Sequence, residues 1–156
     1  MVESQMDAGA LASMFNADNR IALVCGRKKY KKEWDKYKHT YCNIKSAYDN
    51  IKSMIKTLKM FGFKDDQIEV MKDPDSDEME SKMAYIRSKV KKARGKETFF
   101  IWFYYTGHIV TDSEGNVEFV LDEDEYLHVQ KYLLKVMDLS NAYIFSIMDI
   151  YQDEKP

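Results

Sequence analysis

Three short apolar runs along the chain predict buried β-strands. These runs occupy residues 21–25, 98–105 and 142–148. Continuous apolar runs of this length are typical of strands buried on both faces, because a strand with one solvent-facing side alternates instead. A fourth strand is predicted at residues 67–72, where Ile68 and Val70 alternate with Glu69.

Two longer segments carry apolar residues at every third or fourth position, which predicts helices with one buried face. The first begins near Ile44 and ends before Gly62, a residue type that commonly follows the last turn of a helix. The second begins at Asp75 or Ser76, either of which can cap it, and closes at Gly95. Its buried stripe consists of Met79, Met83, Ile86 and Val90.

Two further elements follow the aromatic run at residues 98–105. The turn at residues 113–116 separates two β-prone pieces within residues 109–121, which predicts a hairpin beyond that strand. A third helix is predicted within residues 127–137. Strands that alternate with helices predict an α/β fold, with a doubly wound, mainly parallel sheet and helices on both faces, as a three-layer sandwich.

One domain at residues 20–156 accounts for these elements, because a chain of 156 residues suits a single core. Residues 1–19 are interpreted as a loosely ordered arm without assigned chemistry. They lack the basic start and the long apolar core of a secretory signal or a membrane span. Only Cys25 and Cys42 are present, without a disulfide framework or a zinc pattern, so we expect a reducing, cytoplasmic compartment.

Charge and motif content favour none of the common non-protein ligands. The formal net charge of -2 favours neither a nucleic-acid backbone nor an anionic membrane, and we expect neither as a partner. The acidic residues 122–125 could bind a cation, but we interpret them as a solvated loop. A phosphate-binding loop is rich in glycine, but the segment after the first strand has a single glycine, Gly26. No phosphate-binding loop is therefore indicated, and no cofactor or metal is expected. His39 and His128 lie in polar surroundings and are interpreted as structural residues.

Candidate chemistry lies at the ends of two strands. In open α/β sheets, functional residues gather in loops at the carboxyl ends of the strands. His108 follows Gly107 at the end of the strand at 98–105, and the strand at 142–148 leads into residues 149–153. A histidine at such a strand end can take up and return a proton, because its unperturbed pKa lies near neutral pH.

These segments resemble the caspase, metacaspase and paracaspase superfamily. Residues 21–26 look like its first strand, and residues 58–63 look like the end of its first helix. Residues 103–108, Phe-Tyr-Tyr-Thr-Gly-His, resemble the strand that delivers the catalytic histidine, in its paracaspase and metacaspase form. Residues 144–149, Ile-Phe-Ser-Ile-Met-Asp, resemble the strand before the nucleophilic cysteine. The likeness covers nearly all of residues 21–153.

The resemblance implies roles for four residues of this sequence. His108 would be the general base, Tyr151 occupies the position of the nucleophile, and Gly107 and Ile109 lie in the oxyanion region. A phenol titrates above a thiol and is bulky, so Tyr151 cannot take over the role of a cysteine. Ile109 stands where the family usually has glycine, and its β-branched side chain would crowd the pocket. We therefore expect no cleavage of peptide bonds at this site.

Three functions are compatible with the sequence. The first is a pseudoprotease, an inactive caspase-like domain that acts as a binding, regulatory or structural subunit. The second is an active cysteine endopeptidase that uses His108 with a cysteine elsewhere, either Cys25 or one from a partner chain. However, Cys25 is interpreted as a buried structural thiol, and Cys42 as a surface or half-buried residue. The third is an unrelated doubly wound binding module.

A protein partner is expected for the first of these functions. The resemblance implies two further small-subunit strands, which the sequence lacks, and a bare sheet edge promotes association. The partner would be a homologous caspase-like chain, a small-subunit-like chain or a larger assembly. The basic and aromatic residues 27–38 are interpreted either as a partner-binding surface or as a solvated loop whose aromatic side chains pack against the domain.

Overall fold

The main sheet of the protein consists of parallel strands. The structure, a computed structural model, describes residues 18–30, 41–122 and 125–151. In spatial order the parallel strands are β2 (Ile68–Lys72), β1 (Arg20–Gly26), β3 (Phe99–Thr111) and β6 (Ala142–Tyr151). The end of β3 pairs antiparallel with β4 (Val117–Asp122), which pairs with β5 (Glu125–His128). The sheet therefore has a parallel body and an antiparallel extension.

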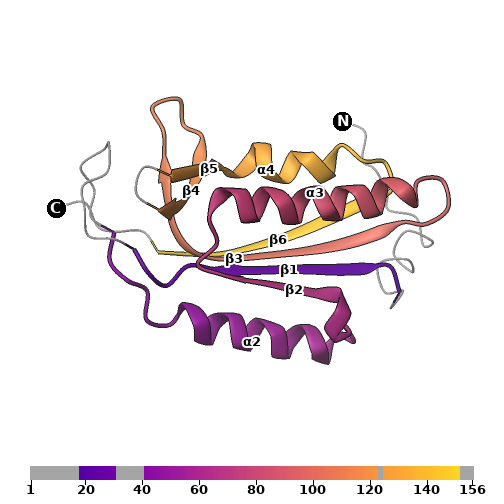
Figure 1. The fold of residues 1–156 in the computed structure, drawn as a ribbon, viewed down its shortest axis with the longest axis horizontal. Coiled ribbons are helices and arrows are strands. Elements are labelled where there is room, and N and C mark those ends of the chain that lie inside the picture. The colour runs from indigo at the N-terminus through magenta and orange to yellow at the C-terminus, as the bar shows by residue number, and fades with distance from the viewer. Residues whose placement is uncertain (1–17, 31–40, 123–124, 152–156) are drawn as a thin grey trace, which may run out of the picture.

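Helices cover both faces of this sheet. Helix α2 (Ala47–Met60) lies on one face, and α3 (Ser76–Lys92) and α4 (Val129–Met137) lie on the other (Figure 1). A short 3-10 turn, η1 (Asp65–Gln67), leads into β2. The predicted α/β fold with three layers is thus confirmed. No helix in the described part of the chain is long and apolar enough to cross a membrane.

The core is divided into one cluster on each side of the sheet. All seven residues of β1 are buried, as its continuous apolar run predicted. Alternate residues of β1 contribute to opposite sides, so Leu23 joins the cluster under α3 and α4, whereas Val24 joins the cluster under α2. The predicted stripe of α3 is buried as well, and the Asp75 carboxylate caps the helix by accepting a hydrogen bond from the backbone N–H of Glu78 (2.8 Å).

Two strands are longer than the sequence predicted. The apolar run of β3 ends at Tyr105, but the strand continues to Thr111, and β6 likewise continues to Tyr151. Residues 107–108 of β3 pair with β6, and residues 109–111 pair with β4 in the predicted hairpin. His108, predicted at the end of this strand, therefore lies within it, because pairing with β6 and then with β4 extends β3 past the end of β1.

Two polar residues of the extension tie it to the helices. The imidazole Nδ1 of His128 caps α4 by accepting a hydrogen bond from the backbone N–H of Lys131 (3.3 Å), so its predicted structural role is confirmed. Glu125 accepts a hydrogen bond from the backbone N–H of Ser76 (2.8 Å), at the start of α3. The interpretation of residues 122–125 as a solvated loop is thus wrong for Glu125. His39 and residues 1–17 of the predicted arm lie outside the described residues.

Candidate functional site

His108 and Tyr151 are direct neighbours across two parallel strands. The two residues are register partners in the pairing of β3 with β6. Their ring centroids are 6.5 Å apart. The structure therefore brings together the two positions that the sequence singled out, but it places both inside strands.

The imidazole of His108 is enclosed by aromatic rings. His108 is only 1% exposed, and the rings of Tyr30 and Tyr41 lie at centroid distances of 4.6 and 5.3 Å from the imidazole. The backbone N–H of His108 donates a hydrogen bond to the Tyr30 hydroxyl (2.9 Å). Of the predicted basic and aromatic loop, Tyr30 packs against the domain, and residues 31–40 lie outside the described residues.

Both ring nitrogens of His108 face carbonyl oxygens. Nδ1 lies 3.2 Å from the carbonyl oxygen of Tyr151, and Nε2 lies 2.9 Å from that of Cys42. A neutral imidazole has one N–H and can donate to one of these oxygens, whereas the doubly protonated ring can donate to both. A general base needs a ring nitrogen that faces the proton to be abstracted. In this geometry, the carbonyl oxygens occupy those directions.

The side chain of Tyr151 is held by other residues. Its hydroxyl forms hydrogen bonds with Ser46 Oγ (2.8 Å) and with Asn50 Nδ2 (3.2 Å), at the start of α2. Asn50 Nδ2 also lies 3.2 Å from the carboxylate of Asp149. Consequently, Tyr151 presents its backbone carbonyl to His108, while its hydroxyl belongs to a separate polar network.

The residues predicted for the oxyanion region have structural contacts. A Cβ added to Gly107 would lie 2.8 Å from the Tyr30 hydroxyl and would also clash with the Tyr105 hydroxyl, so only glycine fits there. Ile109 pairs with Phe119 of β4 and packs against the core. Ile109 lies in the hairpin because β3 continues past His108 to Thr111. Burial raises the pKa of Tyr30 to about 12, so its hydroxyl is neutral at physiological pH.

The two cysteines lie in contrasting environments. Cys25 is fully buried, its thiol lies 3.3 Å from the Tyr104 carbonyl oxygen, and burial raises the pKa of that thiol. The sequence predicted this buried thiol correctly. Cys42 is exposed, and its Sγ lies 4.0 Å from Nε2 of His108. Sequence reasoning missed this contact, although Cys42 precedes α2, whose N-terminus opens at the same end of the sheet as His108.

A comparison with models of protein families identifies the family of this chain. A family model described as the caspase domain matches residues 19–149, a range that includes His108 and stops before Tyr151. The chain belongs to the caspase domain family. A search of curated proteins found no match to this caspase domain.

A surface groove of this caspase domain lies beside Tyr151. The groove has a volume of about 440 Å³ and runs between α2 and β6. Its polar wall includes Asn50, Tyr104 and Asp149, and the Tyr104 hydroxyl donates to the Asp149 carboxylate (3.4 Å). Burial, followed by the charge of Asp149, raises the pKa of Tyr104 to about 12. Among the described residues, no group of three or more His, Cys, Asp or Glu side chains could hold a metal ion.

Proposed function

We propose that this caspase domain is a pseudoprotease that serves as a binding, regulatory or structural subunit. One observation carries the proposal. The residue at the nucleophile position, Tyr151, meets His108 through its backbone carbonyl, and its hydroxyl is bound to Ser46 and Asn50. A phenol held in this way neither attacks a carbonyl nor transfers its proton to His108.

The enclosure of His108 supports the same proposal. With the residue 1% exposed, a peptide carbonyl has no direct approach to the ring without displacement of Tyr30 or Tyr41. The backbone N–H of His108, which lies between the oxyanion-region residues Gly107 and Ile109, is already bonded to the Tyr30 hydroxyl. An oxyanion hole requires donors that are free to bind the developing charge.

The outer edge of β6 supports a role in binding. In the described part of the chain, β6 pairs with β3 alone. Its side chains Tyr143, Phe145 and Ile150 are 37%, 47% and 42% exposed. Natural sheet edges of this length usually carry charged side chains, proline or a bulge, and the ten residues of β6 include no proline and a single charged residue, Asp149, near the C-terminal end. Such an edge favours the addition of a strand.

The partner that fits this edge is a polypeptide that continues the sheet. The ring of Phe145 contacts that of Trp102 on β3 in a tilted arrangement at a centroid distance of 4.9 Å, and Phe61, which also lies beside Trp102, is 60% exposed. A partner strand with apolar cover would bury these rings as well as the backbone of β6. We therefore infer a homologous caspase-like chain, a small-subunit-like chain or a larger assembly of such chains. Both cysteines are free thiols, which suits the intracellular compartment that we propose.

A variant of the β6 edge tests the binding role. Phe145→Lys should weaken association at least about tenfold, because burial of a phenylalanine contributes roughly 1.5–3 kcal/mol. Val70→Lys is a matched control, since Val70 is a partly exposed apolar residue on β2, at the opposite edge of the parallel body. Association with co-expressed caspase-like chains can be measured by analytical ultracentrifugation. Equal behaviour of the two variants would argue against β6 as the interface.

A second candidate function is favoured by the contact between Cys42 and His108. An imidazolium near a thiol favours the thiolate, and a thiolate is the nucleophile of cysteine peptidases. The Sγ atom lies 4.0 Å from Nε2, and Cys42 is exposed. In this alternative, Cys42 would attack the scissile carbonyl, and His108 would return a proton to the departing amine.

Peptidase assays distinguish the two candidates. We expect the wild-type chain to leave a library of fluorogenic peptides with basic or acidic P1 residues intact, and Cys42→Ser to behave identically. Turnover that is abolished by both Cys42→Ser and His108→Ala would establish the second candidate and refute the pseudoprotease. Cleavage gained by Tyr151→Cys combined with Ile109→Gly would support the alignment of Tyr151 with the nucleophile.

A further inference from the structure

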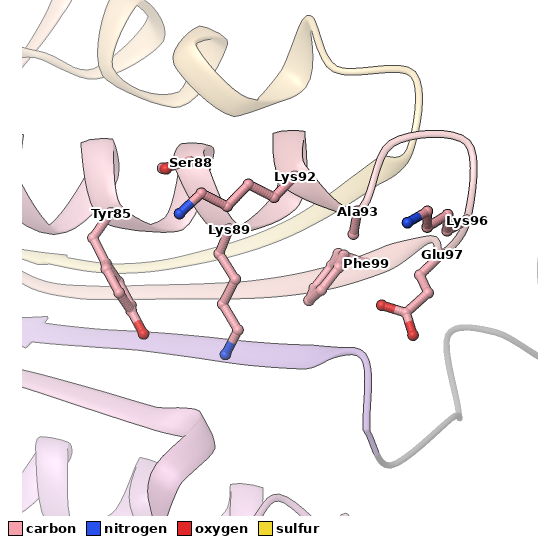
Figure 2. A pocket seen from close by; sticks show the side chains of 8 residues that line it. All are labelled: Tyr85, Ser88, Lys89, Lys92, Ala93, Lys96, Glu97 and Phe99. Atoms are coloured by element: carbon pink, nitrogen blue, oxygen red, sulfur yellow. The ribbon is translucent and has the colours of Figure 1, made fainter.

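A hollow with a positively charged rim lies along the C-terminal half of α3 (Figure 2). It has a volume of about 580 Å³ and reaches Phe99, the first residue of β3. His108 lies nine residues further along the same strand, which corresponds to a separation of about 30 Å. The hollow is therefore a separate surface from the site around His108.

The positive charge comes from three exposed lysines. Lys89 and Lys92 lie in the last turns of α3, and Lys96 follows Gly95 in the loop before β3. Lysines at a helix C-terminus complement the helix dipole, but this accounts only for the two residues within the helix. Glu97 also lines the hollow, so three positive charges and one negative charge leave a net charge of +2.

These lysines differ from the other cations around α3. Lys82 and Arg87 of the same helix form ion pairs with Glu69 (2.6 Å) and Asp138 (2.8 Å). By contrast, Lys89, Lys92 and Lys96 form no ion pair with the residues that the structure describes. The hollow is thus a positively charged patch on a chain whose net charge is -2. An anion placed there would meet lysines that form no ion pair, with Glu97 as the one carboxylate in the lining.

The floor of the hollow is apolar and aromatic. Phe99 is buried beneath it, and Ala93 lies between Lys92 and Lys96 along the chain. Figure 2 shows Tyr85 and Lys89 leaving α3 in the same direction, one helical turn apart. Tyr85 is 54% exposed, so its ring offers a flat face to a ligand. A concave, partly apolar surface with a few cations, of a volume within the usual range for ligand pockets, suits a small organic anion.

We propose that this hollow binds a nucleoside polyphosphate. The base stacks on the ring of Tyr85, and the phosphates lie between the ammonium groups of Lys89, Lys92 and Lys96. Stacking of a base on an aromatic side chain contributes about 1–3 kcal/mol where it has been measured by substitution. Lysine binds phosphate as a point charge, so the affinity should fall as salt rises.

Isothermal titration calorimetry of the full chain with ATP tests the proposal. The double variant Lys89→Glu/Lys92→Glu should weaken ATP binding at least about tenfold. The matched control is Lys52→Glu/Lys56→Glu, which reverses two lysines on α2, on the other side of the sheet. Circular dichroism checks that both variants are folded. Absence of ATP binding at about 1 mM, or equal loss in the two variants, would overturn the proposal.

Two further ligands separate the base from the phosphates. Inorganic tripolyphosphate should bind the wild type more weakly than ATP, and Tyr85→Ala should reduce the affinity for ATP but not for tripolyphosphate. Equal affinity for both ligands would overturn the assignment of a nucleotide. A single-stranded oligonucleotide that binds more tightly than ATP would overturn it in favour of a nucleic-acid strand.

Discussion

Replacement of Tyr30 by Phe removes one hydroxyl group from the enclosure of His108. That hydroxyl accepts a hydrogen bond from the backbone N–H of His108 (2.9 Å), and both residues are buried. In the variant, the N–H is left without this acceptor, and a buried unsatisfied donor costs about 1–3 kcal/mol. The packing of the Tyr30 ring on the imidazole, at 4.6 Å between centroids, is preserved. The loss of stability therefore reports on the hydroxyl.

The free energy of unfolding can be measured by urea denaturation followed by circular dichroism. For a domain of this size, each kcal/mol lowers the Tm by about 2–4 °C. Because burial raises the pKa of Tyr30 to about 12, its hydroxyl stays protonated, and the effect should be constant between about pH 6 and 9.

Tyr85→Phe is the matched control for this experiment. Its ring is 54% exposed, so water can solvate the groups that its hydroxyl leaves behind. We expect this control to change the free energy of unfolding by less than about 0.5 kcal/mol. If Tyr30→Phe is as stable as the control, the Tyr30 hydroxyl does not hold the backbone of His108, and the closed site that supports the pseudoprotease proposal loses one of its elements.

Two other substitutions and one labelling experiment probe the surroundings of the site. Gly107→Ala should lower the free energy of unfolding by about 1–3 kcal/mol, measured by urea denaturation, because the added methyl group collides with the hydroxyls of Tyr30 and Tyr105. Asp73→Asn should destabilise the protein at pH 7, with a difference that shrinks below about pH 4. Burial acts to raise the pKa of Asp73, but hydrogen bonds from the Tyr48 hydroxyl and from the backbone N–H groups of Lys29 and Lys28 outweigh it, and the pKa is lowered. The folded-state pKa lies below the unfolded value, so the stabilisation is present above the unfolded pKa and is lost as the carboxyl becomes protonated. A difference in Tm between the two proteins that stays constant from pH 3 to pH 7 would contradict this. Iodoacetamide should modify one thiol of the folded chain, at Cys42, since burial shields Cys25 and raises its pKa. Mass spectrometry that finds a label on Cys25 before Cys42 would contradict the buried position of that residue.

The layers of the fold could be predicted from the sequence because they depend on local patterns. The run of β1 is apolar at consecutive positions, which only burial on both faces explains, and both faces of β1 are indeed covered. Helix α3 combines an apolar stripe with an N-cap at Asp75 and basic residues in its last turn. The resemblance in residues 103–108 then identified the family, and the match to the caspase domain confirms it.

The closure of the site could not be predicted, because it depends on contacts between distant segments. Nothing local in the sequence of residues 106–111 shows that β4 and β6 will pair with them and keep His108 within a strand. The contacts of His108 with Tyr30, Cys42 and Tyr151 join residues separated by 78, 66 and 43 positions. Of these, the alignment with the family brought only Tyr151 to the site, and it gave no information on the direction of its hydroxyl.

The contact between the rings of Phe145 and Trp102 makes the indole an intrinsic fluorescent reporter of events at the β6 edge. Trp102 is partly buried, and in the described part of the chain its indole N–H has no hydrogen-bond acceptor. The sequence has two tryptophans, and the other, Trp34, lies outside the described residues. In a Trp34→Phe background, the emission of a single fluorophore would follow the loss of water around Phe145 whenever another chain covers this edge.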